Sequence, residues 1–206
     1  MKEKEKMLAG KPYRAFGEEL VAERQAAKEL IFEFNSLHPG KTEQRNKIIQ
    51  RLFGKAGKNF IIEPPFRCDY GYNISVGENF YANYNCTIID CAKVIIGDNA
   101  FIAPNVSLFT AGHPVHPDIR NEQLEYALPI FIGNSVWLGG GVIVNPGVTI
   151  GDNAVIGSGS VVTKDIPANV VAVGSPCRVK RKITEQDKIN FLEMVHDEQK
   201  YTDTYR

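Results

Sequence analysis

The sequence predicts a mostly β fold in which a single chain winds into a parallel β-helix, because its apolar residues repeat every six positions. Six apolar residues fall six apart, and four of them are followed directly by glycine: Ile132, Leu138, Val144, Ile150, Ile156 and Val162. Helices and ordinary strands repeat every 3.6 and 2.0 residues, so neither explains this period. A six-residue period is typical of a coil whose flat faces each use one hexapeptide.

The same period is present upstream with two interruptions. It slips by two residues between Ile88 and Ile96 and stops after Leu108. The tripeptide Gly-Asp-Asn occurs twice within the repeat, at 97–99 and 151–153. Glycine and asparagine accept left-handed backbone angles, which suits corner turns. Because such a coil buries its core by stacking turns, we expect one β-helix domain over residues 59–182.

Two amphipathic helices are predicted in an N-terminal helical segment, residues 1–58. Their apolar stripes are Leu20, Ala27, Leu30, Ile31 and Phe34 in the first, and Ile48, Ile49, Leu52 and Phe53 in the second. A third helix is predicted in the C-terminal tail, residues 183–206, where Thr184 and Asp187 resemble a capping box. The open ends of a coil expose sheet edges, so we expect these helices to cover them.

Composition excludes several classes of function. The 206 residues carry 24 basic and 24 acidic side chains, so no basic field indicates nucleic-acid binding. No apolar run approaches the roughly 20 residues of a membrane span, and the charged N-terminus lacks the apolar core of a signal peptide. We therefore expect a cytoplasmic protein with no nucleic-acid or membrane partner. Its four cysteines form no CxxC pair, which favours reduced, partly buried thiols.

The long break in the repeat, residues 109–131, is the strongest functional signal. Its first half is polar and rich in proline, so it cannot form another coil face and must loop outward, where functional residues are frequent. The insertion holds His113 and His116. Histidine titrates near neutral pH, and we take His113 as the candidate general base. His-x-x-His could alternatively bind zinc, but it supplies only two ligands, so no metal site is predicted.

Several further segments share one family pattern. Besides the repeat they are Met7–Tyr13, Phe32–Asn35, Asn79–Asn85, Gly112–His116, Asn145–Gly151 and Gly174–Arg178. On these motifs the chain resembles the maltose/galactoside O-acetyltransferases, within the hexapeptide-repeat acyltransferase superfamily. The resemblance implies a left-handed β-helix assembled as a homotrimer, with active sites between subunits. It also implies direct transfer of acetyl from acetyl-CoA to a hydroxyl of a sugar acceptor such as maltose, glucose or a galactoside.

The resemblance also assigns roles to residues. His113 would remove the hydroxyl proton, and Asn83 would donate to the thioester carbonyl oxygen as charge develops there. The residues that would contact acetyl-CoA are Asn83, Gly140, Ser158, Thr163, Lys164, Arg178 and Arg181. The three cations suit the phosphates of coenzyme A. The residues that would bind the sugar are Asp69, Tyr81 and Glu125. Glu125 could instead orient His113, and without the resemblance Asn83 would be interpreted as a corner asparagine.

Two departures from the family pattern concern the acceptor. The stretch after Tyr13 lacks the aspartate that the family head usually carries, and Cys91 stands where the galactoside branch has an aspartate. The acceptor half is therefore matched less well than the acetyl-CoA half.

Two other functions stay open. One is a zinc lyase of the carbonic-anhydrase kind that uses His113 and His116, and the other is a non-catalytic binding protein.

Overall fold

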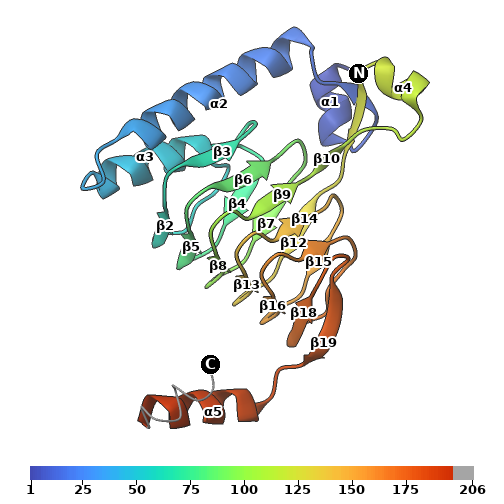
Figure 1. The fold of residues 1–206 in the computed structure, drawn as a ribbon. Helices are drawn as coiled ribbons and strands as arrows, with labels where there is room; N and C mark the ends of the chain where they lie inside the picture. The colour runs from blue at the N-terminus through green and yellow to red at the C-terminus, as the bar shows by residue number, and fades with distance from the viewer. Residues whose placement is uncertain (197–206) are drawn as a thin grey trace.

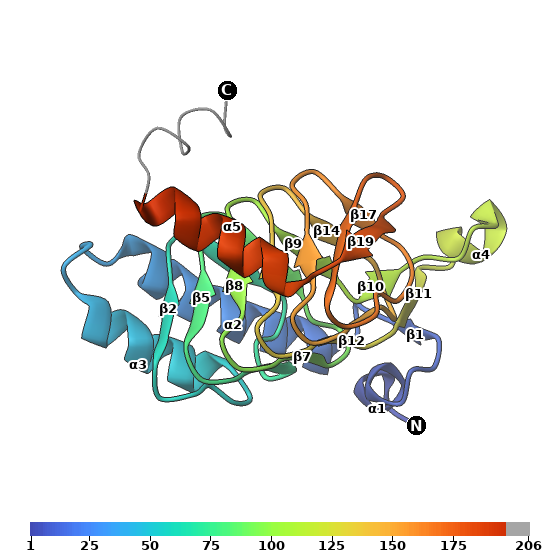
Figure 2. The same cartoon turned by 90° about the horizontal axis from the view of Figure 1, so that it is seen from below.

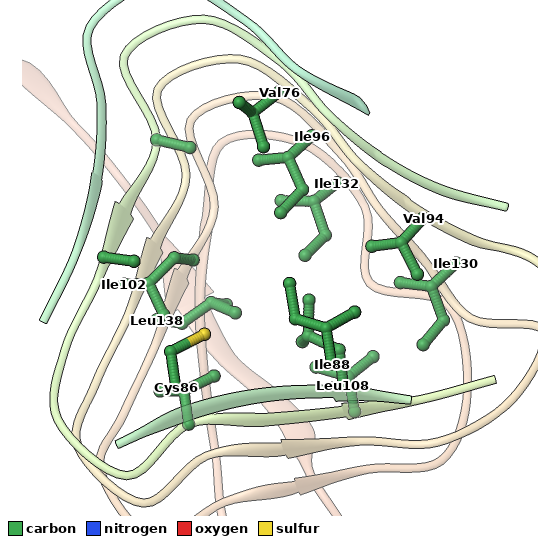
Figure 3. Close-up of a cluster of buried hydrophobic side chains, with 14 of the residues drawn as sticks. Val76, Cys86, Ile88, Val94, Ile96, Ile102, Leu108, Ile130, Ile132 and Leu138 are labelled. Carbon is green, nitrogen blue, oxygen red and sulfur yellow. The ribbon is translucent and has the colours of Figure 1, made fainter. Parts of the chain in front are cut away.

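The computed structural model describes residues 1–196, and most of them form a triangular prism (Figure 1). Each turn of the chain contributes three short parallel strands, one to each face. Figure 3 looks into the prism and shows its walls enclosing an apolar core. The predicted parallel β-helix is confirmed, and the left hand of its winding stays a prediction. Of the predicted C-terminal tail, residues 197–206 lie outside the described residues.

The faces are named in the order in which one turn visits them. Face 1 contains β4 (Ile74–Val76), β7 (Val94–Ile96), β12 (Ile130–Ile132) and β15 (Thr149–Ile150). Face 2 contains β2 (Phe60–Ile62), β5 (Phe80–Ala82), β8 (Phe101–Ile102), β13 (Trp137–Leu138), β16 (Val155–Ile156), β18 (Val170–Val173) and β19 (Arg178–Lys182). Face 3 contains β3 (Phe66–Cys68), β6 (Cys86–Ile89), β9 (Ser107–Phe109), β14 (Ile143–Val144) and β17 (Val161–Val162).

Corners of successive turns stack along the edges where two faces of the prism meet. Corners that come after face 2 strands stack along the 2–3 edge, and corners that come after face 3 strands stack along the 3–1 edge. Corners that come after face 1 strands use the two predicted Gly-Asp-Asn tripeptides, whose last residues, Asn99 and Asn153, have φ angles of 54° and 59°. These positive angles confirm that the tripeptides form corners.

The six-residue period arises because each face of the prism uses one hexapeptide, whose apolar residue points inward and stacks on those of the neighbouring turns. On face 1 Ile150 lies beside Ile132, and on face 2 Leu138 lies between Ile102 and Ile156. All five side chains are at most 3% exposed, and Figure 3 shows three of them, Ile102, Ile132 and Leu138, pointing inward. Neighbouring turns therefore bury one another's apolar groups, which is the main stabilising contribution in such a coil.

The slip in the period has a structural cause at the 3–1 edge. Ile88 and Val144 occupy equivalent inward positions on face 3, and Ile96 and Ile150 occupy the next inward positions on face 1. The step from face 3 to face 1 takes eight residues from Ile88 to Ile96 but only six from Val144 to Ile150. The two additional residues are accommodated in the corner after β6, where the side chain of Asp90 is buried. The insertion leaves the coil on the same edge, one turn later. All irregularities of the repeat are thus concentrated on one edge of the prism.

Two N-terminal helices cover the first turn of the coil, as predicted (Figure 1). They are α2 (Glu18–Ser36) and α3 (Thr42–Leu52). Ile31 and Phe34 of α2 and Ile49 of α3 are buried in one cluster with the first coil strands. The segment ahead of them is not entirely helical, because α1 (Glu3–Leu8) is followed by a two-residue strand, β1 (Tyr13–Arg14).

The insertion is a hairpin and not an irregular loop. Its strands β10 (Ala111–Gly112) and β11 (Leu124–Ala127) are antiparallel, and α4 (Pro117–Asn121) forms its tip. Figure 2 shows α4 at the end of an arm that projects from the prism. The N-terminal strand β1 pairs with the free side of β11, so a three-stranded sheet ordered β1-β11-β10 fixes the base of the arm.

The C-terminal end of the coil is covered differently from the prediction. Strand β19 pairs antiparallel with β18 and closes its edge. The predicted third helix exists as α5 (Glu185–His196), and the Asp187 carboxylate accepts from the backbone N–H of Thr184 at 2.8 Å, as in a capping box. However, α5 lies apart from the prism (Figure 1), and its apolar residues Ile189, Phe191, Leu192 and Val195 are exposed. It does not cover the coil.

Two predictions from composition concern the cysteines and the membrane. All four cysteines are free and buried, where partly buried thiols were predicted. Within residues 1–196 no helix combines the length and apolar content needed to cross a bilayer.

Replacing Ile150 by Ala should remove part of the stacked core. Ile150 is fully buried, so the cavity and the lost transfer energy should lower the free energy of unfolding by about 2–5 kcal/mol. The neighbouring Thr149 points outward on the same strand, and Thr149→Ala serves as the control with a loss below about 1 kcal/mol. Urea unfolding followed by circular dichroism measures both values. Equal losses for the two variants would contradict the inward stacking.

Candidate active site

The residues predicted to act on substrates lie along two different edges of the prism. The 2–3 edge carries Asn83, Gly140 and Ser158. The 3–1 edge carries Asp69, Thr163, Lys164 and the insertion with His113 and Glu125. The width of face 3 separates these edges, so the chain does not bring His113 and Asn83 together by itself. Each edge carries only half of the predicted site.

A row of three side chains crosses the small sheet at the base of the insertion. Glu125 is the middle residue, because β11 pairs with β1 on one side, where Tyr13 is its partner, and with β10 on the other. His113 follows β10 directly and falls opposite Glu125 when the register of Gly112 with Tyr126 is continued by one residue. The Nε2 atom of His113 lies 3.9 Å from Oε1 of Glu125. The Tyr13 hydroxyl donates to Oε2 of Glu125 at 2.9 Å.

The contact made by the second ring nitrogen of His113, Nδ1, determines which tautomer of the neutral imidazole is favoured. Nδ1 lies 3.4 Å from the backbone carbonyl oxygen of Leu124, and a carbonyl oxygen can only accept. This contact is a hydrogen bond only when Nδ1 carries the proton, which leaves the Nε2 lone pair available in the neutral ring. The imidazole is 55% exposed and the Glu125 carboxylate 15% exposed. A substrate can therefore reach Nε2, while the carboxylate beside it is shielded.

Asn83 presents an amide N–H at the 2–3 edge. Its Oδ1 accepts from the backbone N–H of Tyr84 at 2.7 Å, as expected of a corner asparagine, and this bond orients the amide. Nδ2 has no hydrogen-bond partner among residues 1–196, and the side chain is half-buried. The corner role and the predicted donor role use different atoms, so Asn83 can fill both.

A buried carboxylate supports the corner that contains Asp69. The Oδ1 atom of Asp90 accepts the backbone N–H groups of Asp69 and Tyr70 at 3.0 and 2.9 Å. Burial raises the pKa of Asp90 to about 6, and its Oδ2 has no hydrogen-bond partner among the described residues. The Cys91 thiol contacts Oδ2 of Asp69 at 3.5 Å. Burial also raises the pKa of Cys91, which favours the thiol over the nucleophilic thiolate.

The predicted phosphate-binding cations are exposed towards the C-terminal end of the coil. Lys164 lies in the corner after β17, and Arg178 and Arg181 lie on β19. Arg181 already has a carboxylate partner, because its guanidinium donates to both oxygens of Asp187 at 2.6 and 2.9 Å. This bond holds the pKa of Asp187 at about 2. Arg178 donates to its neighbour's carbonyl oxygen, which leaves part of its guanidinium accessible.

Neither the backbone conformation nor the local packing of the chain requires a glycine at position 140. Its φ angle is not positive, and a Cβ atom there would meet only the Pro104 carbonyl oxygen, at 3.5 Å. The glycines on either side differ. A Cβ at Gly139 would lie 2.7 Å from the backbone nitrogen of Ser158, and Gly141 has a φ angle of +69°. The absence of a side chain at 140 therefore matters only for a molecule that approaches from outside.

Tyr81 lies apart from the other two predicted acceptor residues. It is on the outward side of face 2, where its ring packs beside Phe101 with centroids 6.4 Å apart. Asp69 and Glu125 belong to the 3–1 edge. Tyr81 precedes Asn83 by two residues, so its neighbours are those of the 2–3 edge.

The second histidine of the insertion has a local structural role. Nδ1 of His116 accepts from the backbone N–H of Asp118 at 3.3 Å and thereby caps α4. Among the described residues no group of three or more His, Cys, Asp or Glu side chains is arranged to hold a metal ion.

Two elements of this site were not predicted from the sequence. Tyr13 was recognised only as part of a family motif, and its contact with Glu125 joins residues 112 positions apart. Asp90 belongs to none of the motifs in the sequence. The signal that could have identified it is the slip in the repeat, because a polar residue beside two additional positions indicates a buried corner.

Comparisons with known proteins give consistent matches. Residues 6–57 match the maltose acetyltransferase hexapeptide capping motif, and residues 129–164 match the six-repeat bacterial transferase hexapeptide model. The galactoside O-acetyltransferase of Escherichia coli K12 is 52% identical over 89% of this chain and 91% of that protein.

Two solved structures are similar over nearly their whole length. One is a galactoside acetyltransferase in complex with coenzyme A, which is 52% identical with a TM-score of 0.89 and is matched over 91% of this chain and 94% of its own. The other is a maltose O-acetyltransferase from Clostridium difficile 630. It is 56% identical with a TM-score of 0.89, over 89% of this chain and 98% of its own.

Replacing Asp90 by Asn should remove a pH-dependent contribution to stability. The folded-state pKa of about 6 exceeds the ordinary value of 3.8, so this carboxyl favours folding at low pH. That contribution is lost as the pH rises through about 4 to 6, and it amounts to about 2–3 kcal/mol. Urea unfolding at pH 4 and pH 7 gives the difference in free energy of unfolding between the wild type and Asp90→Asn. From pH 4 to pH 7 this difference (wild type minus variant) should fall by this amount. A difference that does not change with pH would contradict the burial of a titrating carboxylate.

Proposed function

The chain belongs to the maltose/galactoside O-acetyltransferase family, and on that basis we propose that it transfers the acetyl group of acetyl-CoA to a hydroxyl group of a sugar. It is an acyltransferase of the hexapeptide-repeat class, with acetyl-CoA as its co-substrate. The observation that carries the proposed mechanism is the exposed His113 imidazole beside a shielded Glu125 carboxylate.

His113 acts as the general base in this proposal. A sugar hydroxyl is a weak nucleophile, so Nε2 takes its proton while the oxygen attacks the thioester carbonyl carbon. The ring becomes an imidazolium, which the Glu125 carboxylate at 3.9 Å stabilises. The carbon–sulfur bond then breaks, and the imidazolium returns its proton to the departing CoA sulfur. No covalent intermediate on the protein is required, which agrees with the protonated state of Cys91.

Asn83 supplies the complementary electrostatic contribution. Attack on the thioester places negative charge on the carbonyl oxygen, and a fixed N–H aimed at that oxygen lowers the barrier by about 3–4 kcal/mol. The Nδ2 atom of Asn83 suits this role because its amide is already oriented by the bond to Tyr84. The reorganisation that a mobile donor would need is thereby avoided.

The division of these residues between two edges supports a site shared by two copies of the chain. A cyclic homotrimer whose three-fold axis runs parallel to the coil axes and faces face 3 of each copy would set the 3–1 edge of one copy against the 2–3 edge of the next. His113 of one copy would then face Asn83 of its neighbour, and three equivalent sites would result. In this arrangement face 3 of each copy lies between its two half-sites.

Acetyl-CoA is proposed to lie along the junction of these edges. Its pantetheine arm would pass Gly140 and Ser158, and its phosphates would contact Lys164 and Arg178 near the coil end. Thr163, on the same corner as Lys164, offers a hydroxyl donor. Arg181 can contribute only if its bond to Asp187 is exchanged for one to phosphate.

The sugar is proposed to bind at the 3–1 edge next to His113. Asp69 is a half-buried carboxylate whose backbone is held by Asp90, and it can accept hydrogen bonds from sugar hydroxyls. Glu125 is committed to Tyr13 and His113, so we assign it to orientation of the base and not to sugar binding. Because a cysteine occupies position 91, Asp69 is the main acidic contact on this edge.

Mixing two inactive variants tests the shared site. His113→Ala and Asn83→Ala should each lower turnover by about 10²-fold or more, measured as thiol release from acetyl-CoA with a panel of sugars. Trimers assembled from an equal mixture should regain about a quarter of wild-type activity, because random assortment gives one site in four both native groups.

The matched control mixes His113→Ala with Glu125→Ala, which lie on the same edge and should not complement. Failure of the first mixture to recover would contradict the shared site. Unchanged turnover of His113→Ala alone would remove this residue from the mechanism. A stoichiometric zinc in the purified protein, or turnover with none of the sugars, would instead favour the lyase or the binding protein.

Replacing Gly140 by Ala tests the path of acetyl-CoA. The chain accommodates a Cβ atom there, so the free energy of unfolding should change by less than about 1 kcal/mol. The methyl group would obstruct the pantetheine arm, so KM for acetyl-CoA should rise about tenfold while KM for the sugar stays unchanged. Steady-state kinetics and urea unfolding measure both effects. An unchanged KM for acetyl-CoA would exclude a close approach at this corner.

A further inference from the structure

We propose that Tyr13, in the N-terminal strand β1, is a positioning residue for the general base and that it acts through Glu125. The phenol holds one oxygen of the Glu125 carboxylate so that the other faces the His113 imidazole. This inference rests on the proposed function of His113. It assigns to the N-terminal head a part in the chemistry of an insertion that lies about a hundred residues away.

The row of side chains across the small sheet provides the geometry. Tyr13 and Glu125 are direct cross-strand partners, so their side chains lie on one side of the sheet, and His113 follows in the same row. Each oxygen of the carboxylate has a separate neighbour: Oε2 accepts from the Tyr13 hydroxyl at 2.9 Å, and Oε1 lies 3.9 Å from Nε2 of His113. The contact with Tyr13 therefore determines where Oε1 points.

No other group takes over this role within residues 1–196. The hydroxyl of Tyr13 is the one hydrogen-bond donor to the Glu125 carboxylate among the described residues. The cation next to Tyr13 in the sequence, Arg14, pairs instead with Glu122, at 3.7 Å. A glutamate side chain has three rotatable bonds, so without the phenol its carboxylate is free to turn away from the imidazole.

The phenol is held rigidly and keeps its proton. Tyr13 is completely buried in the second core cluster, together with Met7, Leu20 and Cys91. Burial, followed by the neighbouring Cys91 and Glu125, raises the pKa of Tyr13 far above its ordinary value. The hydroxyl therefore keeps its proton and donates a hydrogen bond to Glu125, and its buried surroundings hold it in place.

The role has a chemical consequence at one step of the reaction. When Nε2 takes the hydroxyl proton, the ring becomes positively charged, and a carboxylate fixed nearby stabilises that charge. A carboxylate that must first rotate into place contributes less, because its ordering opposes the step. Tyr13 thus affects turnover without contacting either substrate.

Tyr13→Phe tests the inference, with Tyr72→Phe as the matched control. The Tyr72 hydroxyl also donates to a glutamate, Glu23, at 2.8 Å, and its ring packs against the same cluster, but Glu23 does not face His113. We expect Tyr13→Phe to lower kcat about tenfold with KM for acetyl-CoA unchanged, and Tyr72→Phe to leave both unchanged. Equal kcat for the two variants would overturn the proposal.

Two further measurements separate positioning from a structural effect. In a Glu125→Gln background, Tyr13→Phe should cause no additional loss of kcat, because Tyr13 acts through the carboxylate. A loss as large as in the wild-type background would overturn the proposal. The ring nitrogen NMR signals of His113 should shift in Tyr13→Phe and not in Tyr72→Phe, and unshifted signals in Tyr13→Phe would likewise overturn it.

The NMR comparison does not depend on catalysis. The proposed function of His113 and the proposed role of Tyr13 can therefore be disproved independently. If His113→Ala keeps full turnover, the proposed function of His113 is wrong whatever the NMR signals show. If His113→Ala is inactive but Tyr13→Phe changes neither kcat nor the ring signals, the base assignment stands and the role of Tyr13 is wrong.

Discussion

The stacking of one coil turn on the next is the constraint on which the rest of the structure depends. Each turn must present its branched apolar residues at the height of those above and below, and this fixes the register of every strand, as in the column that includes Ile132 and Ile150. Once the strands are in register, their corners align as well. Residues far apart in sequence, such as Asn83 and Gly140, then lie along one edge, and those that follow face 3 strands lie along another.

Departures from the repeat are tolerated only at corners, because a residue added within a strand would move the inward side chains outward. The structure concentrates these departures at the 3–1 edge, as two additional residues in each of the corners after β3 and β6 and then as the insertion. The insertion acquires order by antiparallel pairing, which the coil itself does not use until β19. The head strand β1 completes that small sheet and joins the N-terminal segment to the chemistry of the edge.

The sequence was sufficient to predict the β-helix and the place of the insertion. The six-residue period located the coil, and its interruption located His113. Pairing between Tyr13 and Glu125 could not be predicted, because a two-residue strand has no periodicity and its partner is 112 positions away. The position of α5 was also not predictable, since an amphipathic pattern indicates a helix but not what covers its apolar side. For Arg181 a positive charge suggested phosphate binding, but a carboxylate six residues later determines its partner.

The position of the tip helix α4 has a consequence for how such enzymes diversify. Antiparallel register is set from the base of the hairpin, so the pair formed by Gly112 and Tyr126 does not depend on how many residues lie beyond His113. Lengthening or shortening the stretch around Pro117–Asn121 would leave His113 and Glu125 where they are. Evolution can therefore change the length of the hairpin tip while the contact between His113 and Glu125 beneath it is inherited unchanged.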